Sequence, residues 1–260
     1  MIRARVRHFN IVLIFAPDAK KGRTYMAKKD IPFEIKEKFV WTDIILGIFF
    51  FLSLLALGLL IAINFRPLYY WNIDWLDLEQ NSGFSAAVIK ENYDALIDYC
   101  SPFCFRELWF PSIPASVSGL SHFAEVKSIF NAVYITGLGS LVITVLWFIR
   151  KARNREKKYL KICGIVTLVI PVLLLIGSAI NFEAIFLAFH RIVFSNEDWI
   201  FNPITDPVIN ILPETYFMEC AIIIAGVIII GAVTVLIIYL KKRGRKHDES
   251  LIPGKKNYVY

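Results

Sequence analysis

Four apolar runs of about 20 residues constrain the fold of this chain more than any other feature. They cover residues 44–64, 130–148, 162–180 and 221–240, and none has a charged residue in its interior. A helix of about 20 apolar residues can cross the roughly 30 Å hydrocarbon core of a bilayer while satisfying its own backbone hydrogen bonds. The runs therefore predict an all-α, multi-pass membrane protein with four transmembrane helices. Pro171, inside the third run, predicts a bend there.

The basic residues alternate between the segments that join these runs. Residues 1–40, 149–161 and 241–260 contain ten, seven and seven Lys and Arg, whereas residues 65–128 and 181–218 contain four and one. Because cytoplasmic loops are enriched in Lys and Arg, we expect both termini to be cytoplasmic and residues 65–128 and 181–218 to be extracytoplasmic. The net charge of +7 then belongs to the inner face. It favours attraction to anionic membrane lipid and does not indicate nucleic-acid binding.

The ends of the chain differ from the spans. Residues 1–25 hold a short apolar run that is broken by Pro17 and lacks a small-residue cleavage site, which is typical of neither a signal peptide nor a span. We expect residues 1–25 to be disordered or a start-site extension, with translation beginning at Met26. Residues 26–43 and 241–260 then form the two cytoplasmic tails.

Short helices are expected in both extracytoplasmic segments. The periodicity of residues 85–100 predicts a helix that lies on the surface. A second helix is predicted to begin with Ser118 or Ser121 as its N-cap and to continue into the second span. Residues 181–194 form either a continuation of the third helix or an interfacial helix.

The four cysteines constrain the chain less. Cys163 and Cys220 lie at the ends of spans, where a cysteine packs as a small apolar side chain. Cys100 and Cys104 share an extracytoplasmic segment, so a disulfide between them remains open. Three residues separate these two cysteines, and a redox CxxC motif is therefore absent.

Two of the four histidines, His122 and His190, lie in aromatic-rich extracytoplasmic sequence close to the spans. Because the imidazole pKa is near neutral pH, such a pair can exchange protons in chemistry on a lipid; the alternative is that both only cap helices or bind loop carbonyls. A helix places Glu125 on the same face as His122. Polar groups near hydrocarbon are costly unless paired, which suggests a wet cavity. The further residues expected to line it are Lys127, Arg191, Asn196, Asp198, Trp199 and Asp206.

Two stretches of these segments carry a resemblance to a known family. They are FPSIPASVSGLSHFAEVKSIFN, residues 110–131, with its His-x-x-x-Val-Lys pattern, and AFHRIVFSNEDWIFNPITDPVINILPETYF, residues 188–217, with Phe-His, Trp, Asp-Pro and Leu-Pro-Glu in order. Both resemble the Lit family of bacterial lipoprotein intramolecular transacylases, which have four spans. Residues 65–109 and the N-terminal extension match no motif of that family.

The resemblance implies a function. An acyl chain would move from the glycerol of a diacylglyceryl-cysteine to the α-amine of the same cysteine, which leaves a lyso-form lipoprotein. His122 and His190 match the essential histidines of the family, no cofactor is implied, and the partners would be a diacylated lipoprotein and membrane lipid. One histidine would take a proton from the α-ammonium and the other would protonate the departing glycerol oxygen, although the sequence does not say which does which.

Two other functions remain open. His122, Glu125 and His190 are potential Zn or Fe ligands of a membrane hydrolase, but there is no His-Glu-x-x-His motif and no further strong ligand, so no metal is predicted. The chain is alternatively a non-catalytic scaffold or sensor whose extracytoplasmic loops bind a partner. The spans carry no charges that would indicate a channel or transporter. The sequence does not indicate an oligomeric state.

Overall fold

The computed structural model describes residues 13–17, 24–28, 41–102, 104–154 and 156–251, which fall into two compact units, Met1–Val40 and Trp41–Tyr260. In the first unit, strand β1 (Leu13–Pro17) pairs antiparallel with strand β2 (Thr24–Lys28). Strand β1 and the first two residues of β2 lie within residues 1–25, for which disorder or a start-site extension stays a prediction. Translation from Met26 stays a prediction. The other residues of the predicted tails, 29–40 and 252–260, lie outside the described residues.

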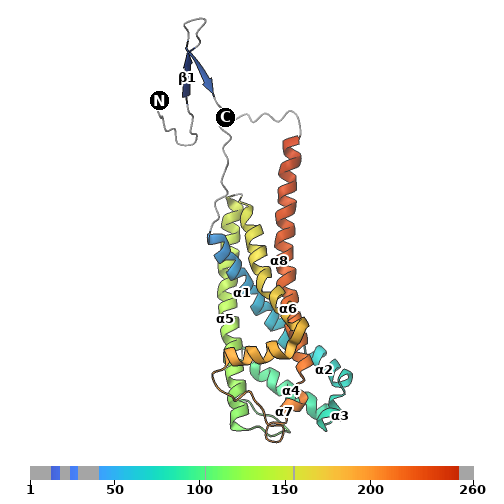
Figure 1. Cartoon of the computed structure of the whole chain (residues 1–260). Coiled ribbons are helices and arrows are strands. Elements are labelled where there is room, and N and C mark those ends of the chain that lie inside the picture. The colour runs from blue at the N-terminus through green and yellow to red at the C-terminus, as the bar shows by residue number, and fades with distance from the viewer. Residues whose placement is uncertain (1–12, 18–23, 29–40, 103, 155, 252–260) are drawn as a thin grey trace. The chain divides into compact units, whose positions relative to one another are not determined.

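Four long helices dominate the second unit and contain the four predicted spans (Figure 1). They are α1 (Trp41–Asn64), α5 (Val117–Arg153), α6 (Lys158–Val193) and α8 (Glu214–Leu251). Helix α1 packs against the other three, and α6 also packs against α8. All four are long and apolar enough to cross a bilayer, which confirms the prediction of a four-span helical membrane protein.

Small residues bring these helices close together. A Cβ atom added to Gly137 of α5 would lie 2.1 Å from the Cβ atom of Ala56 in α1, and one added to Gly164 of α6 would lie 2.6 Å from Cγ of Leu236 in α8. Between membrane helices there is little hydrophobic driving force, so close van der Waals packing of this kind is a main source of association.

The shorter helices lie together at one end of the bundle (Figure 1). They are α2 (Arg66–Trp75), α3 (Leu78–Ser82), α4 (Ala86–Cys100) and α7 (Val208–Ile211). We call residues 65–129 and 181–213 the cap. Helix α5, with 37 residues, is about 55 Å long and exceeds the roughly 30 Å of a hydrocarbon core. Its N-terminal turns therefore belong to the cap.

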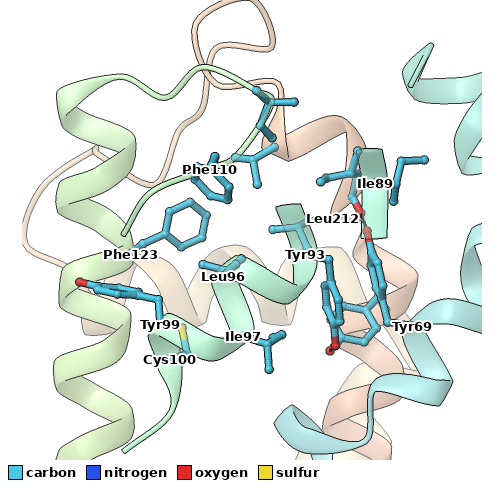
Figure 2. Packing of buried hydrophobic residues seen from close by; sticks show 14 of the residues in the cluster. Tyr69, Ile89, Tyr93, Leu96, Ile97, Tyr99, Cys100, Phe110, Phe123 and Leu212 are labelled. Carbon is cyan, nitrogen blue, oxygen red and sulfur yellow. Dashed lines mark hydrogen bonds between the residues drawn. The ribbon is translucent and has the colours of Figure 1, made fainter. Parts of the chain in front are cut away.

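Tyrosines form the centre of the cap (Figure 2). The rings of Tyr69 and Tyr93 stack with centroids 3.5 Å apart, and the hydroxyls of Tyr93 and Tyr216 are 2.8 Å apart. The Tyr69 hydroxyl donates to the carbonyl of Ile211 over 2.5 Å. Aromatic stacking and satisfied hydroxyls thus join α2, α4, α7 and the start of α8.

Helix α4 forms where a surface helix was predicted, and one of its faces is buried in the cap. Ile89, Asn92 and Tyr93 are at most 1% exposed and pack into the cap core, whereas Lys90, Glu91 and Asp98 of the same helix are exposed. Its buried amide is satisfied: Nδ2 of Asn92 donates to the Val88 carbonyl and to the Ser112 hydroxyl, both over 2.7 Å.

The four cysteines are all free thiols. Cys100 lies in the cap core at 3% exposure, and burial raises the pKa of its thiol to about 12. Because the thiolate is the reactive form, Cys100 is a poor partner for disulfide formation with Cys104.

The packing of α5 on α1 gives a prediction with a matched control two residues away. Replacing Gly137 with Ala forces the two helices apart, and we expect it to lower the free energy of unfolding by about 1–3 kcal/mol. Replacing Gly139 with Ala, where an added Cβ meets nothing within 4 Å, should be neutral or slightly stabilising. Unfolding of both variants in SDS-containing mixed micelles measures the difference. Equal stability of the two variants would contradict the packing.

Candidate functional site

The start of α5 holds His122 in position. Ser116 is the N-cap of α5, with its hydroxyl accepting from the Gly119 amide over 3.0 Å, so our prediction of Ser118 or Ser121 is wrong by at least two residues. The Asp206 carboxylate accepts from the Ser116 amide over 2.7 Å, which stabilises the positive end of the helix. Two turns of α5 later, Phe123 is buried in the cap core against Phe110 (Figure 2), and the neighbouring His122 is therefore directed away from that core.

A break in α6 brings the second histidine into the cap. Asn181 has non-helical backbone angles (φ −159°, ψ 96°), and its side-chain oxygen accepts from the Ala184 amide over 2.9 Å. Asn181 is thus the N-cap of a new helical segment that ends at Val193. Figure 1 shows this last part of α6 turned crosswise to the long helices. Pro171, where we predicted a bend, has no such break; the chain changes direction ten residues later.

The two imidazoles lie together inside the cap. Their ring centroids are 6.0 Å apart, and His122 and His190 are only 5% and 9% exposed. Phe194 contacts both rings, at 4.7 Å from His122 and 5.6 Å from His190. Phe201 lies 5.5 Å from His122, and Trp199 lies 5.1 Å from His190. The pair is therefore enclosed by aromatic rings, which exclude water.

The hydrogen bonds of His190 define its neutral form. Its Nδ1 atom is 2.8 Å from the Phe186 carbonyl, one turn earlier in α6. A carbonyl only accepts, so Nδ1 carries the proton and donates it. The Nε2 atom of His190 is then unprotonated and able to accept a proton from a bound molecule.

Both imidazoles favour the neutral state. Burial, with a smaller contribution from the nearby His190, lowers the pKa of His122 to about 4, whereas the charge of Asp198 opposes the shift. Burial also lowers the pKa of His190, and the bond to the Phe186 carbonyl opposes that shift. At neutral pH the site therefore presents two uncharged imidazoles, ready to take up protons.

A carboxylate is held next to the pair. Glu125 is one turn beyond His122 on α5, and its Oε1 atom accepts from Nδ2 of Asn196 over 2.8 Å. Asn196 is itself fixed, because its side-chain oxygen accepts from the Asp198 amide and its carbonyl accepts from the indole of Trp199, both over 3.0 Å. The loop after α6 thus holds the Glu125 carboxylate in a defined position.

An open cleft of about 410 Å³ lies along α5 beside these residues. It runs over one face of α5 and reaches the end of α6 and the loop that follows. Its lining residues are Ser121, Ala124, Glu125, Ser128, Ile129, Val193, Phe194 and Ser195. Neither histidine lines the cleft, but Phe194 lines it and also contacts the His122 ring, so the cleft adjoins the histidine pair.

Three residues that we expected at the site lie elsewhere. The ammonium of Lys127 is 3.9 Å from the centre of the Tyr99 ring, on the α4 side of α5. Asp206 holds the N-terminus of α5 and does not contact the imidazoles. Arg191 follows His190 but is exposed. Neighbours in sequence point about 100° apart on a helix, which explains why Arg191 diverges from His190.

Other residues of the site escaped the sequence reasoning. Phe186 and Phe194 lie four residues before and after His190, a helical spacing that was visible in the sequence. The close approach of Gly119 to Asp206 could not be seen in the sequence: a Cβ atom on Gly119 would lie 2.3 Å from Oδ1 of Asp206. The sequence contains an N-cap signal at Asn181, with Glu183 in the turn that follows. This signal lies inside an apolar stretch.

A metal is not favoured by this arrangement. Within the part of the chain that the structure describes, no three His, Cys, Asp or Glu side chains are grouped as metal ligands. Glu125 is directed to Asn196 and does not complete a ligand set with the two histidines.

Comparison with known proteins gives a consistent result. The model of the family described as lipoprotein intramolecular transacylase Lit matches residues 44–217. The chain is similar to a solved structure of the membrane-integral lipoprotein intramolecular transacylase Lit from Bacillus cereus, with 32% identity and a TM-score of 0.75 over 79% of this chain and 95% of that one. None of the curated proteins matches it significantly.

Two further solved structures of the Bacillus cereus protein each have one histidine replaced. The variant with arginine has 31% identity and a TM-score of 0.70, over 80% of this chain and 92% of that one. The variant with alanine has 32% identity and a TM-score of 0.70, over 79% of this chain and 93% of that one.

The pKa of His122 predicts how stability depends on pH. An unfolded histidine takes up a proton near pH 6.5, whereas folded His122 does so only near pH 4. The unfolded state therefore binds more protons between these values, and His122 should cost up to about 3 kcal/mol of stability as the pH falls from 6.5 to 4. Unfolding titrations should show a smaller loss of stability over this pH range for the His122→Phe variant. The phenyl ring suits the aromatic surroundings of this position. A variant that loses as much stability as the wild type over this range would contradict the burial of a neutral imidazole.

Proposed function

Because the chain belongs to the lipoprotein intramolecular transacylase (Lit) family of membrane acyltransferases, we propose that His122 and His190 catalyse its acyl transfer. The acyl chain moves from the glycerol of a diacylglyceryl-cysteine to the α-amine of the same cysteine, and the product is a lyso-form lipoprotein. The observation that carries this proposal is the buried pair of neutral imidazoles, 6.0 Å apart, beside an open cleft.

The first step is removal of a proton from the α-ammonium. An α-amine has a pKa of about 7.7–8.0, so it is largely protonated at neutral pH and cannot attack the ester. Nε2 of His190 accepts the proton, since Nδ1 is already committed to the Phe186 carbonyl. The free amine then forms a bond to the ester carbonyl carbon, and a tetrahedral oxyanion results.

Collapse of the oxyanion completes the transfer. The bond between the carbonyl carbon and the glycerol oxygen breaks, and the His190 imidazolium returns its proton to that oxygen. The nitrogen still holds a second proton, which the regenerated His190 imidazole accepts and passes to solvent. An amide and a free glycerol hydroxyl then remain, so atoms and charge balance without a cofactor. His122, whose lowered pKa keeps it neutral, acts as a hydrogen-bond donor to the oxyanion and not as a source of a full proton.

The enclosure of the pair favours this intramolecular reaction. Amine and ester belong to one molecule, so the protein only has to hold them in a reactive geometry, which is worth several kcal/mol. Phe194, Trp199 and Phe201 keep water from the imidazoles. Water would otherwise compete with the amine and hydrolyse the ester.

The orientation in the membrane is part of the proposal. The basic segments at both ends and between α5 and α6 face the cytoplasm, and the cap faces the opposite side, where lipoproteins are anchored. The diacylated lipoprotein then reaches the cleft from the outer leaflet.

The histidine mechanism predicts the effect of two substitutions. His122→Ala and His190→Ala should each reduce formation of lyso-form lipoprotein at least about 100-fold, because each removes a group that acts in proton transfer or oxyanion stabilisation. Mass spectrometry of lipoproteins from cells expressing each variant measures this, with membrane insertion checked by immunoblot. His247→Ala, in the basic C-terminal tail, is the matched control and should keep full activity. Wild-type levels of lyso-form product from either site variant would rule out the pair, and absence of product from the wild type would rule out the reaction.

The orientation predicts which introduced cysteines react on intact cells. Ser118→Cys, at an exposed position in the cap, should be labelled by a membrane-impermeant maleimide, whereas Asn154→Cys, exposed between α5 and α6, should be labelled only after permeabilisation. The wild type, with its four native cysteines, measures the background. The reverse pattern would place the cap in the cytoplasm.

A further inference from the structure

The cleft beside the histidines has a polar lining that acyl-chain binding does not require. Ser121, Glu125 and Ser128 repeat at helical spacing along one face of α5, and Ser195 faces them from the loop after α6. Of the apolar lining residues, Ile129 directly precedes the predicted second span and Val193 is the last residue of α6. A hydrocarbon chain alone would gain nothing from the serines and the carboxylate, so the cleft also receives a polar part of the substrate.

Glu125 is the one acidic side chain that lines this cleft, and half of its carboxylate is unsatisfied. Oε1 accepts from Asn196, whereas Oε2 is shielded from solvent and has no hydrogen-bond partner. A shielded carboxylate oxygen without a partner is costly, and a cation bound in the cleft removes that cost.

The protein does not supply this cation from the neighbouring basic residues. Lys127, two residues along α5, is directed to the Tyr99 ring, and Arg191 is exposed on the last turn of α6. The imidazole of His122 stays neutral, because burial and the adjacent His190 lower its pKa. Among the described residues, none forms an ion pair with Glu125.

We infer that Glu125 binds the α-ammonium of the lipid-modified cysteine and so selects substrates whose α-amine is free. This inference rests on the proposed function, and it assigns the amine-binding group of the same site. Asn196 occupies Oε1, so Oε2 is the oxygen left without a partner for the ammonium, and the position of Glu125 one turn from His122 puts the bound nitrogen within reach of the imidazole pair.

The same contact separates substrate from product. After acyl transfer the nitrogen belongs to an amide, which carries no positive charge and only one N–H. Glu125 then loses its ionic partner, and the product is bound less tightly than the substrate. A lipoprotein that is already N-acylated is rejected for the same reason, because it leaves the shielded carboxylate unpaired.

Binding of an unreactive probe tests this assignment apart from catalysis. The probe is a short peptide whose N-terminal cysteine carries a glycerol with two ether-linked alkyl chains, which cannot transfer an acyl group. It is compared with the same peptide bearing an N-acetyl group, using the full-length protein in lipid nanodiscs. At pH 6.5 the wild type should bind the free amine about tenfold more tightly than the acetylated peptide, as expected for a charge-assisted hydrogen bond. At pH 9.5, above the amine pKa of about 8, this preference should disappear.

Two variants make the comparison specific. Glu125→Gln keeps an oxygen that accepts from Asn196 but removes the charge, and it should bind both peptides with equal affinity. Glu197→Gln removes a charge from an exposed position of the neighbouring loop and should keep the tenfold preference. A wild type without the preference at pH 6.5, or a Glu125→Gln variant that retains it, overturns the inference. The ester-linked peptide, assayed with the wild type in the same nanodiscs, reports separately on the proposed function, which falls if no acyl transfer occurs.

Discussion

The break of α6 at Asn181 is the constraint on which the site depends. An unbroken helix would carry His190 about 14 Å further along its own axis, because each of the nine residues after Asn181 adds 1.5 Å. The extended backbone of Asn181 and its bond to the Ala184 amide instead begin a helical segment that crosses the cap. That segment brings His190 to His122 and also supplies Phe194 and the start of the loop that holds Glu125.

The electrostatics of the site follow from this enclosure. Aromatic rings surround both imidazoles, and their burial disfavours the cationic form of each. A neutral histidine with one nitrogen committed to a carbonyl is a base in a defined tautomer, which is what proton removal from an ammonium requires. The carboxylate of Glu125 is different, because it lines the open cleft and one of its oxygens has no hydrogen-bond partner.

Some polar residues of the cap lie at the histidine site, and others make structural contacts elsewhere in the cap. Helix geometry decides which of the two roles a residue has. His122 faces the second histidine, whereas Lys127 on the same helix packs its ammonium on Tyr99. Asp206, from the same loop region as Asn196 and Asp198, stabilises the N-terminus of α5. Sequence reasoning grouped all of these residues because they are polar and close together along the chain. The side of α5 on which a residue lies decides what it contacts. The contacting residue can be far away in the sequence, as with Ser116 and Asp206, which are 90 residues apart.

The sequence by itself determined the four membrane helices, the accumulation of polar and aromatic residues in the segments at one end of them, and the histidines and the carboxylate most suited to chemistry there. These features are local: span length and helical spacing are properties of consecutive residues. Only the tertiary structure decided that the two imidazoles meet, which face of α4 is buried in the cap, and that one oxygen of Glu125 is held by Asn196 while the other is left without a partner. Those outcomes depend on the backbone angles of one residue and on contacts between distant segments. A sequence periodicity encodes neither these backbone angles nor these contacts, because packing energies, and not local propensity, decide between alternative arrangements of the chain.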